Sequence, residues 1–306
     1  PIVERVILSE STKPSKANKE VADPEEETAV IDERKLLREN WVPGHSTAFN
    51  LKDLRSFLKK HRVLPDQHRG VVWSYLLNLP RNVLCYDNYI KKGVHKAFED
   101  LDRTFPLKNP QLTKKLGRVL SALAHYSPAF AEKHLIPFVV FPFVKLLGQD
   151  ECGAFEVALT FMMHWGQHFL ENFPHPSTCL IEYAYECLQF NDPQLAQHFK
   201  AKDVKLGDYL WSGWTNLYTD LLPRSEWLVL FDTLVAYPEY PEMFILLGVA
   251  ELIYKREAFL SVQSPEQLKA IIEHLRIDNV KSLLKMSTEL LYNTIKAGGK
   301  EYPYKR

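Results

Sequence analysis

The sequence has few cysteines, and none of them is spaced as a metal ligand or a redox pair. The four, Cys85, Cys152, Cys179 and Cys187, form no CxxC motif and no paired cluster with histidine. This argues against a zinc site and against a disulfide framework. We therefore expect a cytoplasmic protein in a reducing compartment, with no metal of its own.

Long hydrophobic runs and an excess of one charge are also missing. The longest apolar run, Met243 to Tyr254, contains Glu251 and is much shorter than the roughly 20 residues that span a bilayer. It predicts a buried helix. Lysine plus arginine equals aspartate plus glutamate at 38 each, so the chain has no overall field that would attract nucleic acid or an anionic membrane. We expect neither nucleic-acid binding nor direct membrane insertion.

A glycine-rich phosphate loop, a repeat of fixed period and the alternating β-branched pattern of strands are absent as well. From about residue 51 onward, apolar residues recur at spacings of three and four. The chain is therefore predicted to be all-helical, an irregular bundle rather than a solenoid. We also expect that it does not bind nucleotide itself.

The helical pattern divides the chain into three parts. Residues 1–50 are polar and partly acidic and suit an arm or linker, 51–260 form the main domain, and 261–306 form a C-terminal helical extension. Because the first residue is not methionine, we expect a piece of a longer protein. The predicted helices cover about 51–61, 66–78, 88–104, 110–126, 130–147, 152–171, 177–190, 193–200, 207–221, 224–236, 240–255, 264–274 and 279–297.

The segment "VLPDQHRGVVWSYLLNLP" places Arg69 one helical turn before Trp73, with Pro65 near the start of the helix. At this i, i+4 spacing the guanidinium can pack on the indole while the ring enters the core. An ordinary amphipathic helix has the same spacing, and from spacing alone that interpretation is favoured. His164 and His168 are also i, i+4, but the glutamate of H-E-x-x-H is absent, so a packed aromatic helix is favoured over a metal site.

The segment "GVHKAFEDLDRTFP" offers an exposed arginine. If it is one helix, Val94, Phe98, Leu101 and Phe105 form its buried stripe. Arg103 then lies about 200° from its neighbours Leu101 and Phe105 and points away from the core. Asp100, one turn earlier, could hold the guanidinium in one direction. An ordinary surface ion pair, contributing about 0.3–0.5 kcal/mol, would leave the same pattern and is favoured from spacing alone.

Three segments together resemble the TBC family, the helical GTPase-activating domains for Rab proteins. Pro65, Arg69 and Trp73 match the family's R-x-x-x-W region, and Asp100, Arg103 and Thr104 match its D-x-x-R-T motif. Ala97 stands where isoleucine is usual. The resemblance runs from about Asn50 to about Leu260 and includes "YLWSGWTNLYTDLLPRSEWLVLFD". It implies an all-α TBC-type fold with two helical subdomains.

The third family motif, Y-N-P followed by G-Y-x-Q-G, is altered. In "HYSPAFAEKHLIPF", Tyr126 aligns with the tyrosine, and His134 occupies the glutamine position. Ala131, Glu132 and Leu135 also depart from the pattern.

The resemblance implies that Arg103 stabilises charge on the γ-phosphate of a bound Rab, whereas the glutamine that orients water is lost. GTP and magnesium would belong to the partner. It therefore implies a Rab-binding module with weak or no activating power, acting as an effector or adaptor. Two alternatives stay open: an activator that uses Arg103 with the GTPase's own glutamine, and a helical scaffold that binds no GTPase.

Within the family, the chain is similar to a member associated with centrosomes and cilia. This likeness rests on "LSALAHYSPAF", "IPFVVFPFVKL" and "FEVALTFMMHWGQHFLENFPHP". It implies a place at the centrosome, basal body or cilium, a role in ciliary or vesicle trafficking, and partners there.

Overall fold

The structure, a computed structural model, describes residues 51–262, 264–277, 279–299 and 301–303. The arm or linker predicted over residues 1–50 lies outside these residues. The described part contains helices and no strand, which confirms the all-helical prediction. In chain order, the elements are α3 (Leu51–His61), α4 (Asp66–Leu76), α5 (Val83–Ile90), the 3-10 helix η1 (Lys96–Phe98), α6 (Leu101–Thr104), α7 (Pro110–Tyr126), α8 (Ala129–Glu132), α9 (Ile136–Leu146), α10 (Glu151–His164), α11 (Gln167–Asn172), α12 (Thr178–Asn191), α13 (Pro193–Ala201), α14 (Leu206–Thr215), α15 (Arg224–Ala236), α16 (Glu242–Tyr254), α17 (Arg256–Leu260), α18 (Pro265–Glu273) and α19 (Val280–Lys296).

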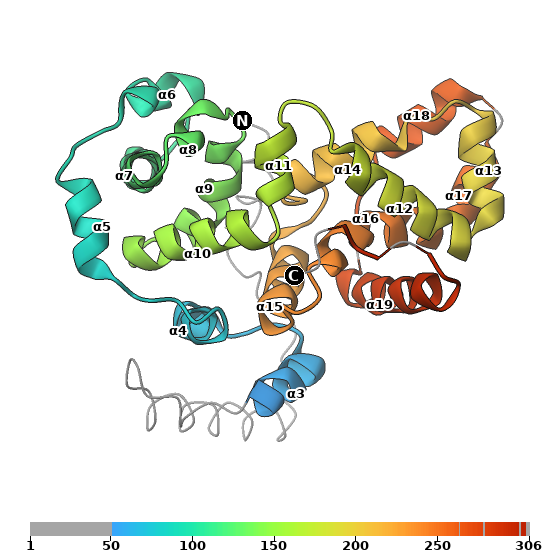
Figure 1. Ribbon diagram of the computed structural model, residues 1–306, viewed down its shortest axis with the longest axis horizontal. Coiled ribbons are helices and arrows are strands. Elements are labelled where there is room, and N and C mark those ends of the chain that lie inside the picture. Colours follow the sequence, from blue (N-terminus) through green and yellow to red (C-terminus); the bar gives the residue numbers. More distant parts are fainter. Residues whose placement is uncertain (1–50, 263, 278, 300, 304–306) are drawn as a thin grey trace, which may run out of the picture.

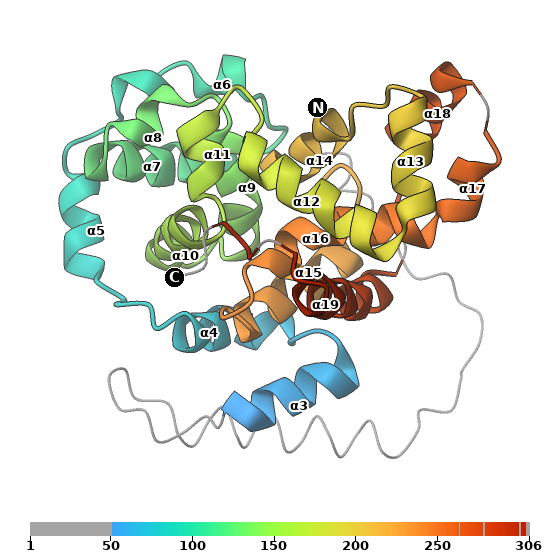
Figure 2. The ribbon, with the colours of Figure 1, turned by 45° about the vertical axis from the view of Figure 1, so that its right-hand side comes forward.

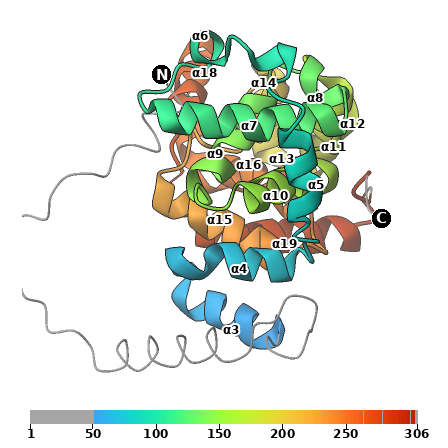
Figure 3. The ribbon, with the colours of Figure 1, turned by 90° about the vertical axis from the view of Figure 1, so that its left-hand side faces the viewer.

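The helices form two groups, and α7 is central to the first (Figure 1). It packs against α5, α9 and α10, and η1, α6 and α8 also contact it (Figure 3). Asn109 begins α7, because its side chain accepts hydrogen bonds from the backbone N–H groups of Gln111 and Leu112 at 3.0 and 3.3 Å. Pro110 occupies the first turn, where its missing N–H costs nothing.

Helix α16 is the centre of the second group. It packs against α12, α14 and α19 (Figure 2). Every residue from Glu242 to Leu252 is buried. The prediction of a buried helix over this apolar run is confirmed. The range expected as a C-terminal extension supplies α18 and α19, and α19 packs on α12, α15 and α16. The second group therefore depends on α19 for its core.

An aromatic cluster joins the two groups. Phe161 of α10 lies 5.7 Å from Phe231 of α15 and 5.5 Å from Phe244 of α16, measured between ring centroids. Phe143 of α9 lies 6.1 Å from Trp227 of α15. Aromatic pairs at these distances contribute about 0.5–1.5 kcal/mol beyond the burial of their surface. The cluster therefore makes the junction part of the core.

Four predicted helices are wrong in extent, and the one expected over 207–221 ends at Thr215 as α14. The helix expected over 88–104 is instead α5, a loop, η1 and α6, because Gly93 takes a left-handed conformation at φ +81° that ends the helix. Val94 is accordingly 58% exposed and not part of a buried stripe. The expected helices 130–147 and 152–171 are each divided in two, and Arg256–Leu260 forms a helix that the pattern did not predict.

Candidate functional site

Arg103 lies on α6 and points into solvent. Its side chain is 80% exposed, and Nη2 donates to Asp100 Oδ2 at 3.2 Å. Because the Asp100 side chain is 73% exposed as well, this ion pair adds little to stability. Its contribution is geometric, since it restricts the directions in which the guanidinium points. The arginine is available to a partner, although the single helix from which its orientation was predicted does not exist.

The short helix α6 is fixed by its backbone and by one aromatic ring. The Asp100 carbonyl accepts hydrogen bonds from the N–H groups of Arg103 and Thr104, both at 3.0 Å, and from Thr104 Oγ1 at 3.1 Å. Phe105, the next residue, is buried, and its ring contacts Phe138 and Phe141 of α9 at centroid distances of 5.1 and 5.4 Å. Arg103 is therefore two residues from an anchored side chain.

The loop before α6 is tied to α7. His125 Nε2 lies 3.0 Å from the Gly93 carbonyl, and the backbone N–H of His95 donates to Ser121 Oγ at 3.0 Å. His95 Nδ1 accepts from the N–H of Ala97 at 3.2 Å and so caps η1. Desolvation and the neighbouring His125 lower the pKa of His95, which favours the neutral ring that this cap requires.

His134 lies exposed in the turn between α8 and α9. On either side of this turn, Phe130 and Leu135 are buried, and Lys133 Nζ donates to the Phe173 carbonyl at 3.5 Å. The N–H of Phe138 donates to the Leu135 carbonyl at 3.0 Å, so helical geometry begins directly after His134. His134 and Arg103 thus come from separate segments of the first group, and the contact between Phe105 and Phe138 joins those segments.

Tyr126, the last residue of α7, is half-exposed and belongs to an aromatic cluster beside α8. Its ring lies 6.3 Å from Tyr89 in an edge contact and 6.4 Å from Phe130 in a near-parallel one. Through its contact with Phe130, Tyr126 supports α8, the helix before His134.

Arg69 and Trp73 lie away from Arg103, in the core between α4 and α15. Both side chains are buried, and both bind one carboxylate: Arg69 Nε is 3.0 Å and Trp73 Nε1 2.8 Å from Asp232 Oδ1. Asp232 Oδ2 accepts from the N–H of Leu64 at 2.7 Å, and Asp66 also pairs with Arg69. Burial raises the pKa of Asp232, and the guanidinium opposes this rise. The R-x-x-x-W motif is therefore structural here.

Sequence reasoning missed Asp232. A signal was present, because Asp232 is the only charged residue in the apolar stretch Trp227 to Ala236 of a predicted helix. A lone carboxylate in such a stretch is buried only with a partner. The partner, 163 residues earlier in the chain, could not be inferred from spacing.

His164 and His168, which are four residues apart, do not share one helix face. Helix α10 ends at His164, and α11 begins at Gln167. His164 Nε2 lies 2.7 Å from the Pro238 carbonyl, and His168 Nδ1 lies 3.6 Å from a Glu171 carboxylate oxygen. Among the described residues, no group of three or more histidines, cysteines or acids is arranged to hold a metal ion. In the same part of the chain, no helix is long and apolar enough to cross a bilayer.

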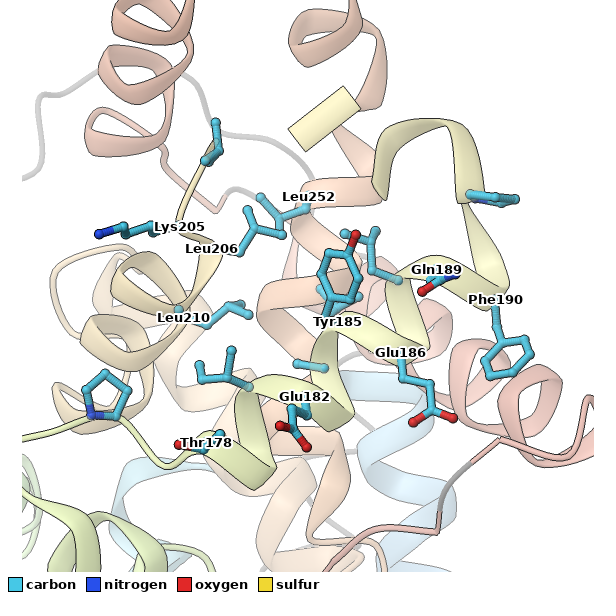
Figure 4. Close-up of a pocket in the computed structure, with 18 residues that line it drawn as sticks. Thr178, Glu182, Tyr185, Glu186, Gln189, Phe190, Lys205, Leu206, Leu210 and Leu252 are labelled. Carbon is cyan, nitrogen blue, oxygen red and sulfur yellow. The ribbon is translucent and has the colours of Figure 1, made fainter. Parts of the chain in front are cut away.

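An apolar hollow of about 1070 Å³ opens in the second group, between α12, α14 and α16. Figure 4 shows Tyr185, Leu206 and Leu252 pointing into it, with Glu182 and Glu186 along α12. Neither Arg103 nor His134 lines this hollow. The arginine face is a separate surface of the molecule.

Two solved structures share this arrangement of helices. The Ypt/Rab-GAP domain of Gyp1p superposes with a TM-score of 0.68 at 14% identity, covering 88% of this chain and 98% of that one. The TBC domain of a Chlamydomonas flagellar RabGAP gives 0.63 at 17% identity, covering 86% and 90%. At these identities the likeness shows the fold alone, and that fold is the TBC type.

Sequence similarity identifies the family of this chain. The profile of the Rab-GTPase-TBC domain matches residues 66–260, and the chain belongs to this family. It is similar to TBC1 domain family member 31 of Bos taurus, at 33% identity over 249 residues, and of Homo sapiens, at 32% over 245. These alignments cover 81% and 80% of this chain but 23% of each relative, so the chain spans about a quarter of their length.

Proposed function

We propose that this domain binds a GTP-loaded Rab GTPase through the face that carries Arg103, and that it accelerates GTP hydrolysis weakly or not at all. The observation that carries the proposal is the solvent-facing Arg103, paired with Asp100 on a helix anchored by Phe105. The likeness to two Rab-GAP domains supports a Rab partner. Binding and catalysis separate in this proposal, because binding needs the Arg103 face alone, whereas strong acceleration also needs a residue that orients water.

Arg103 has the charge and the exposure required of an arginine finger, an arginine that one protein inserts into the active site of another. Such an arginine stabilises the charge that develops on the transferred phosphoryl group and contributes roughly 10³- to 10⁵-fold in rate. A buried arginine such as Arg69, which is held by Asp232, could not reach a bound nucleotide. Arg103 carries only a surface ion pair, which a phosphate can displace at small cost.

His134 is the reason to expect little acceleration. A carboxamide presents a donor and an acceptor together, and both are needed to orient an attacking water. A neutral imidazole also has one donor and one acceptor, but they lie on opposite sides of a short ring. His134 can therefore bind a water without holding it in line with the phosphate. GTP and Mg²⁺ would be brought by the partner.

The test is single-turnover GTP hydrolysis with a panel of GTP-loaded Rabs, together with binding to the GTP and GDP forms. We expect GTP-dependent binding, acceleration of less than about tenfold, and weaker binding by Arg103→Ala. The matched control is Lys285→Ala on α19, which removes a cation that is 81% exposed and also lies near a surface carboxylate. Acceleration of about 100-fold or more, lost in Arg103→Ala, would reject the weak-activity proposal.

Two further variants separate the alternatives. His134→Gln restores the family residue and should raise the hydrolysis rate if the turn between α8 and α9 still presents it correctly. If the partner completes the site with its own glutamine, replacing that glutamine by leucine should abolish hydrolysis while His134→Gln changes little. Absence of binding to every Rab in the panel would favour a helical scaffold and reject the GTPase-binding proposal.

We also propose that the full protein acts at the centrosome, basal body or cilium, in ciliary or vesicle trafficking. The support is similarity to TBC1 domain family member 31 and, at the level of fold, to a flagellar RabGAP. Fluorescent tagging of the full protein, with centriole and axoneme markers, tests this. Uniform cytoplasmic signal in ciliated cells would contradict it.

A further inference from the structure

We infer that Phe138 is a specificity-determining contact residue, which packs against an apolar side chain on the nucleotide-sensitive surface of the bound GTPase. The inference rests on the proposed function and extends it to a residue three positions beyond Leu135, where the third motif ends. Phe138 lies near the start of α9, and its side chain is 36% exposed, although the helix around it is largely buried.

The position of Phe138 follows from two observations. Its ring meets the edge of Phe105 at a centroid distance of 5.1 Å, and Phe105 is two residues from Arg103. His134 precedes Phe138 by four residues along the chain, and α9 begins between them at Ile136. Phe138 is therefore linked to Arg103 through its contact with Phe105, and to His134 by the short segment that joins the turn to α9.

This position determines what the exposed part of the ring meets. If Arg103 reaches the γ-phosphate, side chains beside it must contact the segments that cover the nucleotide. In GTPases those are the switch segments, which the γ-phosphate and Mg²⁺ order and hydrolysis releases. An exposed aromatic ring that packs on buried Phe105, which in turn packs on buried Phe141, is an apolar surface of the kind that is enriched at protein interfaces. Phe138 should therefore favour the GTP form.

The competing explanation is that Phe138 only supports Phe105 and thereby Arg103. A double-mutant cycle between Phe138 and Arg103 distinguishes the two. A contact residue weakens binding by the same factor whether or not Arg103 is present, whereas a support loses its effect once the arginine is removed.

The experiment measures the Kd for a GTP-loaded Rab that binds the unaltered domain, for Phe138→Ala, Arg103→Ala and the double variant. We expect Phe138→Ala to weaken binding about tenfold or more, and equally in the Arg103→Ala background. Phe138→Leu keeps the apolar bulk and should lose less. Tyr292→Ala is the control, because it removes an aromatic ring that is 65% exposed on α19. Thermal unfolding identifies any variant that is not folded.

Two outcomes would overturn the inference while leaving the proposed function intact. One is binding by Phe138→Ala within twofold of the unaltered domain, and the other is a loss that disappears in the Arg103→Ala background. A photo-crosslinking phenylalanine analogue at position 138 should join the domain to the GTP-loaded partner, and one at position 292 should not. If the unaltered domain binds no Rab, the proposed function itself fails, together with this inference.

Discussion

Removal of the Asp232 carboxylate should be among the most destabilising single changes in this domain. Asp232 is fully buried and accepts hydrogen bonds from Arg69, Trp73 and the backbone of Leu64. Asp232→Ala leaves a buried guanidinium without its buried counter-ion and two further donors without an acceptor. The cost therefore includes the desolvation of a charge as well as the lost contacts.

The structure sets the magnitude. Breaking a buried ion pair by removing one partner costs about 3–5 kcal/mol. Arg69 keeps two other partners, the Leu64 carbonyl and Asp66, and the Asp66 side chain is 62% exposed. We therefore expect the lower end, about 3 kcal/mol, which lowers the melting temperature of a domain of this size by about 6–12 °C.

Urea and thermal unfolding, followed by circular dichroism, measure this cost. Asp66→Ala is the matched control, because it removes an exposed carboxylate from the same guanidinium and should cost no more than about 1 kcal/mol. Binding of a Rab, corrected for the folded fraction, should be unchanged in both variants. Equal losses below about 1 kcal/mol for the two variants would refute the assignment of Asp232 as the group that holds Arg69.

The remaining predictions concern pH and two glycines. Partial burial of Glu151 raises its pKa, but the Arg118 ion pair outweighs this and leaves the pKa below its ordinary value of 4.5. The ionised form therefore contributes stability above pH 4.5 that is lost as the pH falls through the lowered pKa. In urea titrations, the difference in free energy of unfolding between the unaltered domain and Glu151→Gln should shrink over that pH range. A constant difference would contradict this prediction. Gly93→Ala should cost about 1 kcal/mol in urea unfolding, because Gly93 has φ +81° with open space around it, and a neutral result would show that the loop adapts. Gly117→Ala should instead stabilise by about 0.5–1 kcal/mol, since Gly117 lies within α7 and an added methyl meets only an ordinary contact; destabilisation would contradict this.

The accuracy of the helix predictions depended on how helices end. α3 and α15 have the predicted bounds, and α15 begins directly after Pro223. The helix over 88–104 failed because the apolar spacing continues through Gly93, where the backbone turns. Periodicity reports which residues are buried, and different short elements can bury them with the same spacing.

The sequence by itself determined the helical class, the buried α16 and the resemblance to the TBC family. These depend on composition, on local periodicity and on motif positions, all of which can be read along the chain. Only the tertiary structure decided that Arg69 and Trp73 bind Asp232 in the core, and that the ring of Phe138 contacts Phe105, two residues after Arg103. Those contacts join residues up to 163 positions apart, and such pairings are set by how helices pack rather than by any local pattern.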